Sequence, residues 1–293
     1  MREFFVHKSF REDSLSTIVA ANQICEEYAA QGFDLTLRQL YYQFVARGLI
    51  ANKDTEYKRL GSIINDARLA GLLDWDYIVD RTRFLRAVRT WDDPGSAINE
   101  AADRYAIDVW ESQPYRLEVW IEKDALVGVI QGICNKYRVP FFSCRGYVSQ
   151  SEMYEAANRM MSWPSRQSSV VLHLGDHDPS GIDMSRDIQD RLDLFGAAAD
   201  VRRIALTMDQ VRALNPPPNP AKITDARSRD YIRRFGTESW ELDALDPATM
   251  SELIEQNILG FIDNSAWEAM AQTEMRQRNR MMEMAAVISE EGI

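Results

Sequence analysis

Two aspartates separated by one residue offer the clearest chemistry in this sequence. Asp176 and Asp178 lie in the run Leu174-Gly-Asp-His-Asp-Pro-Ser-Gly, directly after an apolar stretch. In so tight a turn both carboxylates can face one cation, and hard oxygen ligands suit Mg²⁺ or Mn²⁺ rather than zinc. Taken alone the pattern is weak, because Asp is also a common helix N-cap after a strand. The pair therefore predicts a metal site only with support from elsewhere in the chain.

A third carboxylate gives that support. Glu122 lies in Ile121-Glu-Lys-Asp and ends a second apolar stretch, which has strand-like alternation. If both stretches are strands of one parallel sheet, Glu122, Asp176 and Asp178 meet at the carboxyl ends of the strands, where open α/β sheets bind ligands. The alternative is that Glu122 is a solvated charge or a cap for the following helix. Together the two loops predict a Mg²⁺ (or Mn²⁺) site on these three carboxylates.

The second half of the chain alternates between expected strands and helices. Strands are expected over 115–121, 139–144, 169–174 and 201–207, and helices over 125–137, 149–161 and 181–194. This order is typical of an α/β fold with a parallel, doubly wound, Rossmann-like sheet. The proline-rich stretch 215–220 predicts an extended linker, and the tail from Thr249 is expected to be helical.

The first half is expected to form a small, mainly helical domain. Helices are expected over 10–33, 36–48, 55–70 and near 96–111, with an extended segment over 72–79. Helix, short link, basic helix and β-segment is the order of a winged helix-turn-helix, whose second helix enters the DNA major groove. Lys58, Arg59 and Arg68 lie on the candidate recognition helix and are the expected DNA contacts. The alternative is a helical domain whose basic side chains only face solvent.

The composition is that of a globular protein. Apolar residues make up 45% of the 293, and no apolar run approaches the roughly 18–20 residues that a membrane span needs. Three cysteines are too few for a disulfide framework, so we expect a reduced, cytoplasmic protein without a membrane segment. The net charge of −11 argues against binding nucleic acid by bulk electrostatics, although residues 36–89 carry a local net charge of +4.

A Glu after one strand and Gly-Asp-x-Asp-Pro-x-Gly after another resembles the Toprim domain, the metal-binding module of topoisomerases, primases and some nucleases. This form is similar to that of the topoisomerase VI A subunit and its relative, the meiotic double-strand-break transesterase. In that family a CAP-like winged-helix domain comes first and carries a motif such as Arg-Asp-(Leu/Ile)-Tyr-Tyr. This chain has Arg38-Gln-Leu-Tyr-Tyr42, and later Glu241-Leu-Asp-Ala-Leu, which resembles the family's Glu-x-Glu-Ala-Leu segment.

The resemblance covers about residues 35–250, and the chain is most similar to the short stand-alone Mini-A proteins of bacteria, archaea and their viruses. It implies a winged-helix DNA-binding domain over 1–111, a Toprim domain over 112–248 and a helical C-terminal segment over 249–293. It also implies a location near the nucleoid. Gln39 replaces the acidic residue usual in the tyrosine motif, and Ser180 takes a position that is acidic in some Toprim proteins.

By this resemblance Tyr42 is the catalytic tyrosine. Its oxygen would attack a DNA phosphodiester, form a 5′-phosphotyrosyl link and leave a free 3′-hydroxyl. Arg38, one helical turn earlier, would stabilise the phenolate or the phosphate. Glu122, Asp176 and Asp178 would hold the metal, with Glu122 acting as general acid, as general base or only as a ligand.

Helical periodicity separates the two adjacent tyrosines. Leu37, Leu40, Tyr41 and Phe44 form an apolar stripe, which puts Tyr41 in the core. Tyr42 falls off this stripe, on the side of Arg38, so we expect it to be exposed and functional. A purely structural role for Tyr42 is the alternative.

The resemblance also implies partners. Double-stranded DNA would be the substrate, and a homodimer is expected because family members bring the tyrosine of one subunit to the metal site of the other. The sequence has no nucleotide-binding segment, so strand passage would need an ATPase B-type subunit from another chain. Two other functions keep the same fold: a Toprim nuclease that cuts DNA with activated water, and a DNA-binding protein without catalysis.

Overall fold

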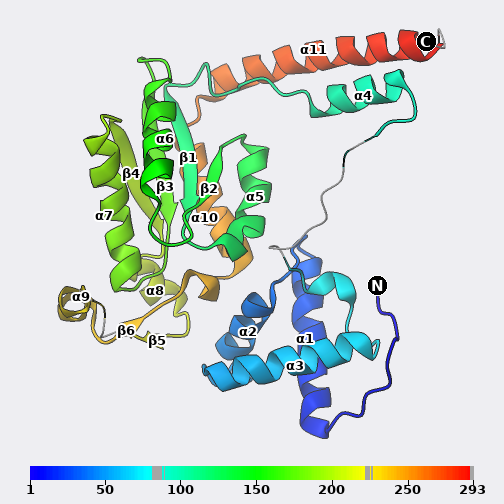
Figure 1. The fold of residues 1–293 in the computed structure, drawn as a ribbon, viewed down its shortest axis with the longest axis vertical. Helices are drawn as coiled ribbons and strands as arrows, with labels where there is room; N and C mark the ends of the chain where they lie inside the picture. The colour runs from blue at the N-terminus through cyan, green and yellow to red at the C-terminus, as the bar shows by residue number, and fades with distance from the viewer. Residues whose placement is uncertain (81–87, 89, 222–224, 226, 291–293) are drawn as a thin grey trace.

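A four-stranded parallel sheet organises the second half of the chain (Figure 1). The computed structural model describes residues 1–80, 88, 90–221, 225 and 227–290. The strands follow the order β2-β1-β3-β4 across the sheet and all pair in parallel. They are β1 (Tyr115–Ile121), β2 (Phe141–Ser143), β3 (Ser168–Leu174) and β4 (Ala199–Ala205). The α/β class and the expected strands are confirmed, with β2 shorter than expected.

The strand order makes the junction of β1 and β3 a topological switch point. β2 lies on one side of β1, and β3 followed by β4 lies on the other. The connection from β1 to β2 and the connection from β3 to β4 therefore run in opposite directions. In such sheets the crevice at this point is where ligands bind. The register pairs Ile121 with Leu174, the last residue of each strand, and the Glu122 amide donates to the Leu174 carbonyl at 2.8 Å.

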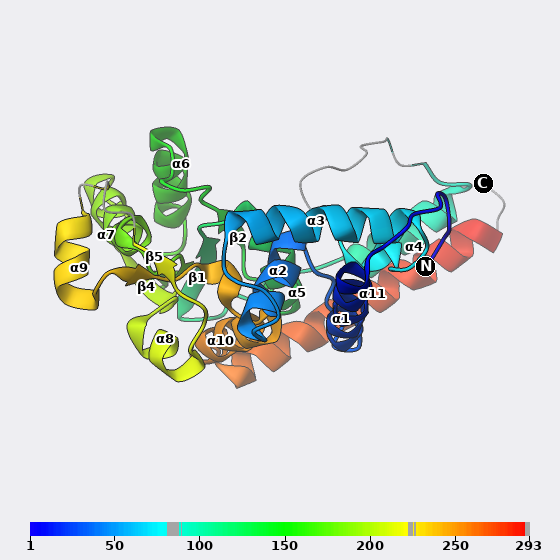
Figure 2. The same cartoon turned by 90° about the horizontal axis from the view of Figure 1, so that it is seen from below.

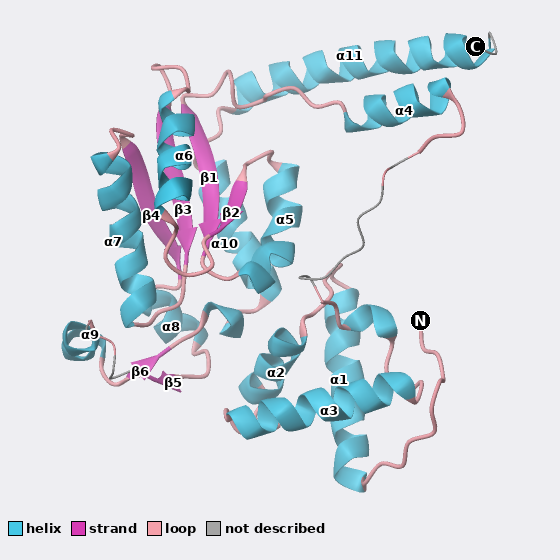
Figure 3. Cartoon of the chain, viewed as in Figure 1, coloured by secondary structure: helices cyan, strands magenta, loops and turns pink. Residues whose placement is uncertain are grey.

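Helices cover both faces of the sheet (Figure 3). Side chains alternate along each strand, so Val119 and Leu172 belong to one apolar core and Trp120 and Val171 to the other. The first core contains α5 and α10, and the second contains α6 and α7. Their bounds are α5 (Val127–Lys136), α6 (Gln150–Met161), α7 (Pro179–Leu194) and α10 (Pro247–Leu259). The doubly wound arrangement expected from the sequence is therefore present.

Three helices pack together at the N-terminal end: α1 (Glu12–Ala29), α2 (Leu37–Ala46) and α3 (Asp54–Leu69). They agree with the expected helices, and Thr36 closes a capping box at the start of α2. The prediction of an extended segment over 72–79 is wrong. Asp74 instead accepts a hydrogen bond from the Asp76 amide and starts a 3-10 turn, η1 (Trp75–Tyr77), and only Ile78 forms an isolated bridge, to Leu35.

A pair of helices extends from the sheet unit. The predicted boundaries place α4 (Pro94–Arg104) with the N-terminal helices, in the domain 1–111. The helix instead lies along α11 (Asn264–Glu290) and not with α1–α3 (Figure 1). The carboxylate of Glu274, buried on α11, explains this, since it accepts a hydrogen bond from the Ile107 amide and pairs with Arg138. The helical tail expected from the sequence is confirmed. No described helix is long and apolar enough to cross a membrane.

Residues 227–246 cross the carboxyl ends of the strands. His177 and Trp240 exchange two backbone hydrogen bonds, and Ala244 contributes to the apolar core of the N-terminal helices. In Figure 2, seen from below, α9, β5 and α2 follow one another across this edge. The remaining elements are η2 (Asp124–Leu126), α8 (Met208–Leu214), β5 (Asn219–Pro220), α9 (Ser228–Phe235), β6 (Glu238–Ser239) and η3 (Leu242–Ala244). Residues 227–246 thus join the sheet edge to the N-terminal helices.

Candidate active site at the carboxyl edge of the sheet

The three carboxylates singled out from the sequence lie at this edge. Glu122 directly follows β1, and Asp176 and Asp178 lie in the loop after β3. The Asp176 amide donates to Glu122 Oε2 at 2.8 Å, which holds the two loops together. Asp178 Oδ1 accepts from the Gly181 amide at 2.6 Å and so caps α7. The structure therefore brings Glu122 against Asp176, while Asp178 also serves as a helix cap.

Two glycines allow this close approach. A Cβ on Gly181 would lie 2.1 Å from the Asp176 carbonyl oxygen, and one on Gly175 would lie 2.9 Å from Glu122 Oε2. Real Cβ atoms essentially never come so near to other heavy atoms. Gly181 is thus required, because it meets backbone, whereas a side chain at Gly175 would displace the carboxylate of Glu122. The guanidinium of Arg203 donates to the carbonyls of both Gly175 and Asp176, at 2.8 and 2.6 Å, and fixes the loop from the other side.

Lys123 is the central cation of the site. Its Nζ lies 3.0 Å from Asp176 Oδ1, 2.9 Å from Glu241 Oε2 and 2.6 Å from Asp243 Oδ2. Burial lowers the pKa of Lys123, but the three carboxylates outweigh this and hold it above its ordinary value. Arg38 Nη2 also binds Glu241, at 2.6 Å. The side chains that form this charged cluster are Arg38, Glu122, Lys123, Asp176, Glu241 and Asp243.

The charged cluster lines an open cavity of about 420 Å³. Burial, followed by repulsion from Asp176 and Asp178, raises the pKa of Glu122 to about 7. Such repulsion between carboxylates is what a bound divalent cation relieves, and their oxygens are donors of the kind that Mg²⁺ prefers. The described residues nevertheless contain no group of three or more His, Cys, Asp or Glu already arranged around one metal position. The donor chemistry fits Mg²⁺ or Mn²⁺, whereas Lys123 now neutralises Asp176.

Tyr42 lies beside the charged cluster, but it is buried. Only 3% of Tyr42 is exposed, so the expectation that it faces solvent is wrong. The reason is tertiary: η3 packs against α2, the Asn219 side chain lies near the Tyr42 hydroxyl, and the Arg38 guanidinium lies 5.9 Å from the Tyr42 ring centre. Tyr41 is in the core as expected, and its hydroxyl bonds Asn52 at 2.9 Å.

The charges around Tyr42 act on it in opposite directions. Burial is the main effect and, together with Glu241, raises the pKa of Tyr42 to about 12. The Asn219 side chain and the positive charges of Arg38 and Lys123 work against this rise. Tyr42 is therefore a neutral phenol at pH 7, with two cations close enough to stabilise its phenolate.

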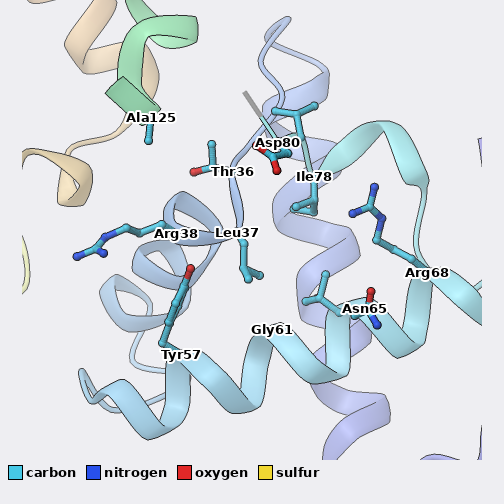
Figure 4. Close-up of a pocket in the computed structure, with 12 residues that line it drawn as sticks. Thr36, Leu37, Arg38, Tyr57, Gly61, Asn65, Arg68, Ile78, Asp80 and Ala125 are labelled. Atoms are coloured by element: carbon cyan, nitrogen blue, oxygen red, sulfur yellow. The ribbon is translucent and has the colours of Figure 1, made fainter. Parts of the chain in front are cut away.

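The expected DNA contacts on α3 differ in their surroundings. Lys58 is exposed, and Arg59 is exposed and bonded to Glu56 at 3.0 Å. Arg68 instead packs against its own domain, with its guanidinium 4.4 Å from the Trp75 ring centre and a hydrogen bond to the Trp75 carbonyl. Arg68 also lines a cavity of about 520 Å³ between α2, α3 and Ala125, from which Arg38 points away (Figure 4).

Sequence reasoning missed several residues that build this site. Lys123, Glu241 and Asp243 lie inside motifs noted above but carried no assigned role, and Asn219 and Arg203 were not considered. Lys123 had one local signal, since it directly follows Glu122 at the end of a strand. Arg203 contacts a loop 27 residues before it, and the other three contact residues more than 100 positions away, so only the fold reveals them. No protein-family model matches the sequence, and no curated protein matches it either.

Proposed function

We propose that the protein is a Mg²⁺- or Mn²⁺-dependent DNA-cleaving transesterase of the topoisomerase VI A type, with Tyr42 as its nucleophile. One observation carries the proposal: Tyr42 and Arg38, from α2, meet the carboxylates of the parallel sheet in a single network. Asn219 lies close enough to the Tyr42 hydroxyl to lower its pKa and donates to Glu241, and Glu241 in turn shares Lys123 with Asp176. These groups come from five separate segments, and a purely structural cluster has no need of a phenol beside so many charges.

The proposed reaction exchanges one phosphoester for another. A bond forms between the Tyr42 oxygen and the DNA phosphorus, and the bond between phosphorus and the 3′-oxygen breaks. The phenol proton passes to a base, and the 3′-oxygen takes up a proton to leave as a hydroxyl. Where Glu122 is not itself a ligand of the metal, its pKa of about 7 lets it hold or release a proton near neutral pH, whereas a metal-bound Glu122 would stay ionised and serve only as a ligand. Arg38 and Lys123 supply the positive charge that binds the phosphate.

Glu122, Asp176 and Asp178 would hold the divalent ion. When bound, Mg²⁺ or Mn²⁺ would neutralise charge on the phosphate and stabilise the leaving oxygen. Exposed Lys58 and Arg59 on α3 would contact the duplex. We also propose that the protein forms a homodimer and that strand passage would need a separate ATPase subunit. Tyr42 already lies at the charged cluster of its own chain, so the proposal does not require a second subunit to bring the tyrosine there.

The burial of Tyr42 favours a second candidate function, a hydrolytic Toprim-type nuclease. With 3% of the residue exposed, Tyr42 reaches DNA only after Asn219 and Glu241 move. Water enters the open cavity beside Glu122 and Asp176 without such a movement. In that case Glu122 would take the proton from the attacking water, and Tyr42 would support the fold only.

Plasmid cleavage separates these functions. Supercoiled DNA is incubated with protein and Mg²⁺ or Mn²⁺, stopped with SDS, and run with and without proteinase K. Tyr42→Phe and Asp176→Ala test the site, and Tyr41→Phe is the matched control, because it removes a hydroxyl from the same helix outside the charged cluster. We expect wild type and Tyr41→Phe to leave protein on the DNA ends, and Tyr42→Phe to leave none.

Other outcomes contradict the proposal. Cleavage that survives Tyr42→Phe without any adduct, and stops with Asp176→Ala, identifies the hydrolytic nuclease. Binding without cleavage, under every metal condition and in wild type, identifies a DNA-binding protein instead.

A further inference from the structure

A basic surface lies on α9, outside the charged cluster. Residues 227–235 contain four arginines and one aspartate, a local net charge of +3 in a chain of net charge −11. Arg229, Arg233 and Arg234 are exposed. Arg233 pairs with Asp230 at 2.6 Å, whereas Arg229 and Arg234 form no ion pair with any residue that the structure describes. The Arg234 guanidinium lies 5.0 Å from the Phe235 ring centre but keeps its charge. Arginines without an ion pair, grouped on an acidic protein, form a surface that attracts anions.

The helix that carries these arginines is anchored to the candidate active site. The Tyr231 hydroxyl lies 2.8 Å from both the carbonyl oxygen and Nδ1 of His177, which separates Asp176 from Asp178 in the sequence. The Phe235 ring packs on the His177 imidazole, with ring centres 4.8 Å apart. Because Tyr231 and Phe235 occupy the inner side of α9, its arginines remain at the edge of the sheet where the carboxylates lie. Figure 2 shows α9 on the same underside of the molecule as α3.

The cavity beside α9 does not suit a small anion. It has a volume of about 340 Å³ and is lined by Arg186, Arg227 and Arg234, but also by Asp183 and Asp230. Asp183 lies 2.7 Å from Arg186 and 3.0 Å from Arg227, so these two guanidinium groups are already paired. Arg229 and Arg234, which have no ion pair with a described residue, are exposed on the helix. An extended polyanion can reach such separate, exposed cations, since duplex DNA carries a charge for roughly every 1.7 Å of its axis.

We infer that α9 is a second contact for the backbone of double-stranded DNA, with Arg229 and Arg234 each binding a phosphate. The identity of the anion rests on the proposed function. Guanidinium groups bind phosphate oxygens through paired hydrogen bonds and carry no requirement for base sequence. Contacts on α3 and α9 would hold the duplex on both sides of the charged cluster, so that the scissile phosphate lies between two fixed points.

Equilibrium binding without metal tests this contact apart from cleavage. A fluorescent 30-base-pair duplex is titrated with protein in EDTA, and anisotropy gives Kd at several salt concentrations. Arg229→Ala/Arg234→Ala is compared with wild type and with Arg276→Ala/Arg280→Ala, which removes two exposed arginines from α11. We expect the α9 variant to bind about tenfold more weakly at 0.1 M salt, and the slope of log K against log salt to fall by about 2. The α11 variant should match wild type.

The outcomes separate this inference from the function on which it rests. An α9 variant with the Kd and salt slope of wild type overturns the inference alone. A wild-type protein that neither binds nor cleaves DNA overturns the proposed function as well. Arg229→Lys/Arg234→Lys should regain most of the affinity, because it restores the charge. If the double alanine variant melts at a lower temperature than wild type, the Kd and salt slope are measured for Arg229→Glu instead. This change lies at an exposed position without a described side-chain partner.

Discussion

Lys123 should stabilise the fold as well as the site, and Lys123→Met tests this. Methionine keeps much of the length and packing of lysine but removes the ammonium group that lies within 3.0 Å of Asp176, Glu241 and Asp243. The Asp243 side chain is only 1% exposed, and its Oδ1 has no hydrogen-bond partner among the described residues. The variant thus leaves a buried carboxylate with Arg38, 3.6 Å away, as its nearest described cation.

The size of the effect follows from the cost of an unpaired buried charge. Removing one member of a buried ion pair costs about 3–5 kcal/mol, and the remaining Arg38 reduces this to about 2–3 kcal/mol at pH 7.5. Burial already raises the pKa of Asp176 in the folded protein, and Lys123 works against this rise, so removing the ammonium raises the pKa of Asp176 further. The penalty at Asp176 is therefore present while this carboxylate is charged and disappears as it takes up a proton. We expect the difference from wild type to shrink as the pH falls from 7.5 to 5.

Urea denaturation at the two pH values measures this difference. Lys123→Met/Asp243→Asn should recover more than half of the lost stability, because the second change removes the unpaired charge. Lys136→Met is the matched control. Its partner Glu255 is more exposed and Lys136 itself is 60% exposed, so its loss should be small beside that of Lys123→Met. The reasoning is refuted if Lys123→Met costs no more than Lys136→Met, or if the double variant is no more stable than the single one.

Further predictions concern the loop after β3 and the strand before it. Gly181→Ala should cost about 1–3 kcal/mol and abolish metal-dependent cleavage, because its Cβ would lie 2.1 Å from the Asp176 carbonyl oxygen. Gly132→Ala, at an exposed position of α5 with open space around it, should instead stabilise by about 0.5–1 kcal/mol. Thermal melting checks both, and a Gly181→Ala protein as stable as Gly132→Ala contradicts the packing argument. Burial lowers the pKa of His173 to about 3 in the folded protein, against about 6.5 when unfolded, so stability should fall as the pH drops below 6.5, by about 2 kcal/mol at pH 5. Urea titrations at pH 7.5 and 5 should show this acid loss in wild type and a smaller one in His173→Gln, and an equal loss in both would exclude His173 as its source.

The fold of the second half was predictable because its signals are local. Alternating apolar residues predicted β1 over the same bounds that the structure gives, and the Ser149 cap predicted the start of α6. Parallel pairing then followed from the alternation of strands and helices. The extended segment after α3 failed for an equally local reason, since the Asp74 side chain stabilises a 3-10 turn that strand propensity does not take into account.

Only the part of the site that lies in single loops after strands could be predicted from the sequence. Glu122, Asp176 and Asp178 follow strands, so their meeting at one edge depends on sheet topology alone. The burial of Tyr42 depends on Asn219, Glu241 and η3, which lie more than 170 residues further along the chain. The periodicity of α2 correctly identified the side that faces its own helical domain, but it could not show that a distant segment covers the other side.

Glu241 both helps to cover Tyr42 and neutralises the cations of the site. Glu241 accepts a hydrogen bond from Asn219, which lies near the Tyr42 hydroxyl, and it also binds Arg38 and Lys123. Any movement that exposes the phenol must therefore separate Glu241 from two cations, which is costly when nothing replaces its charge. A DNA phosphate is itself an anion that both cations can bind, so exposure of Tyr42 costs less with DNA in the cavity than without it. This difference ties the transesterase proposal to a measurable property: DNA should increase the reactivity of Tyr42 toward a phenol-modifying reagent such as tetranitromethane, whereas a nuclease that uses water needs no such change.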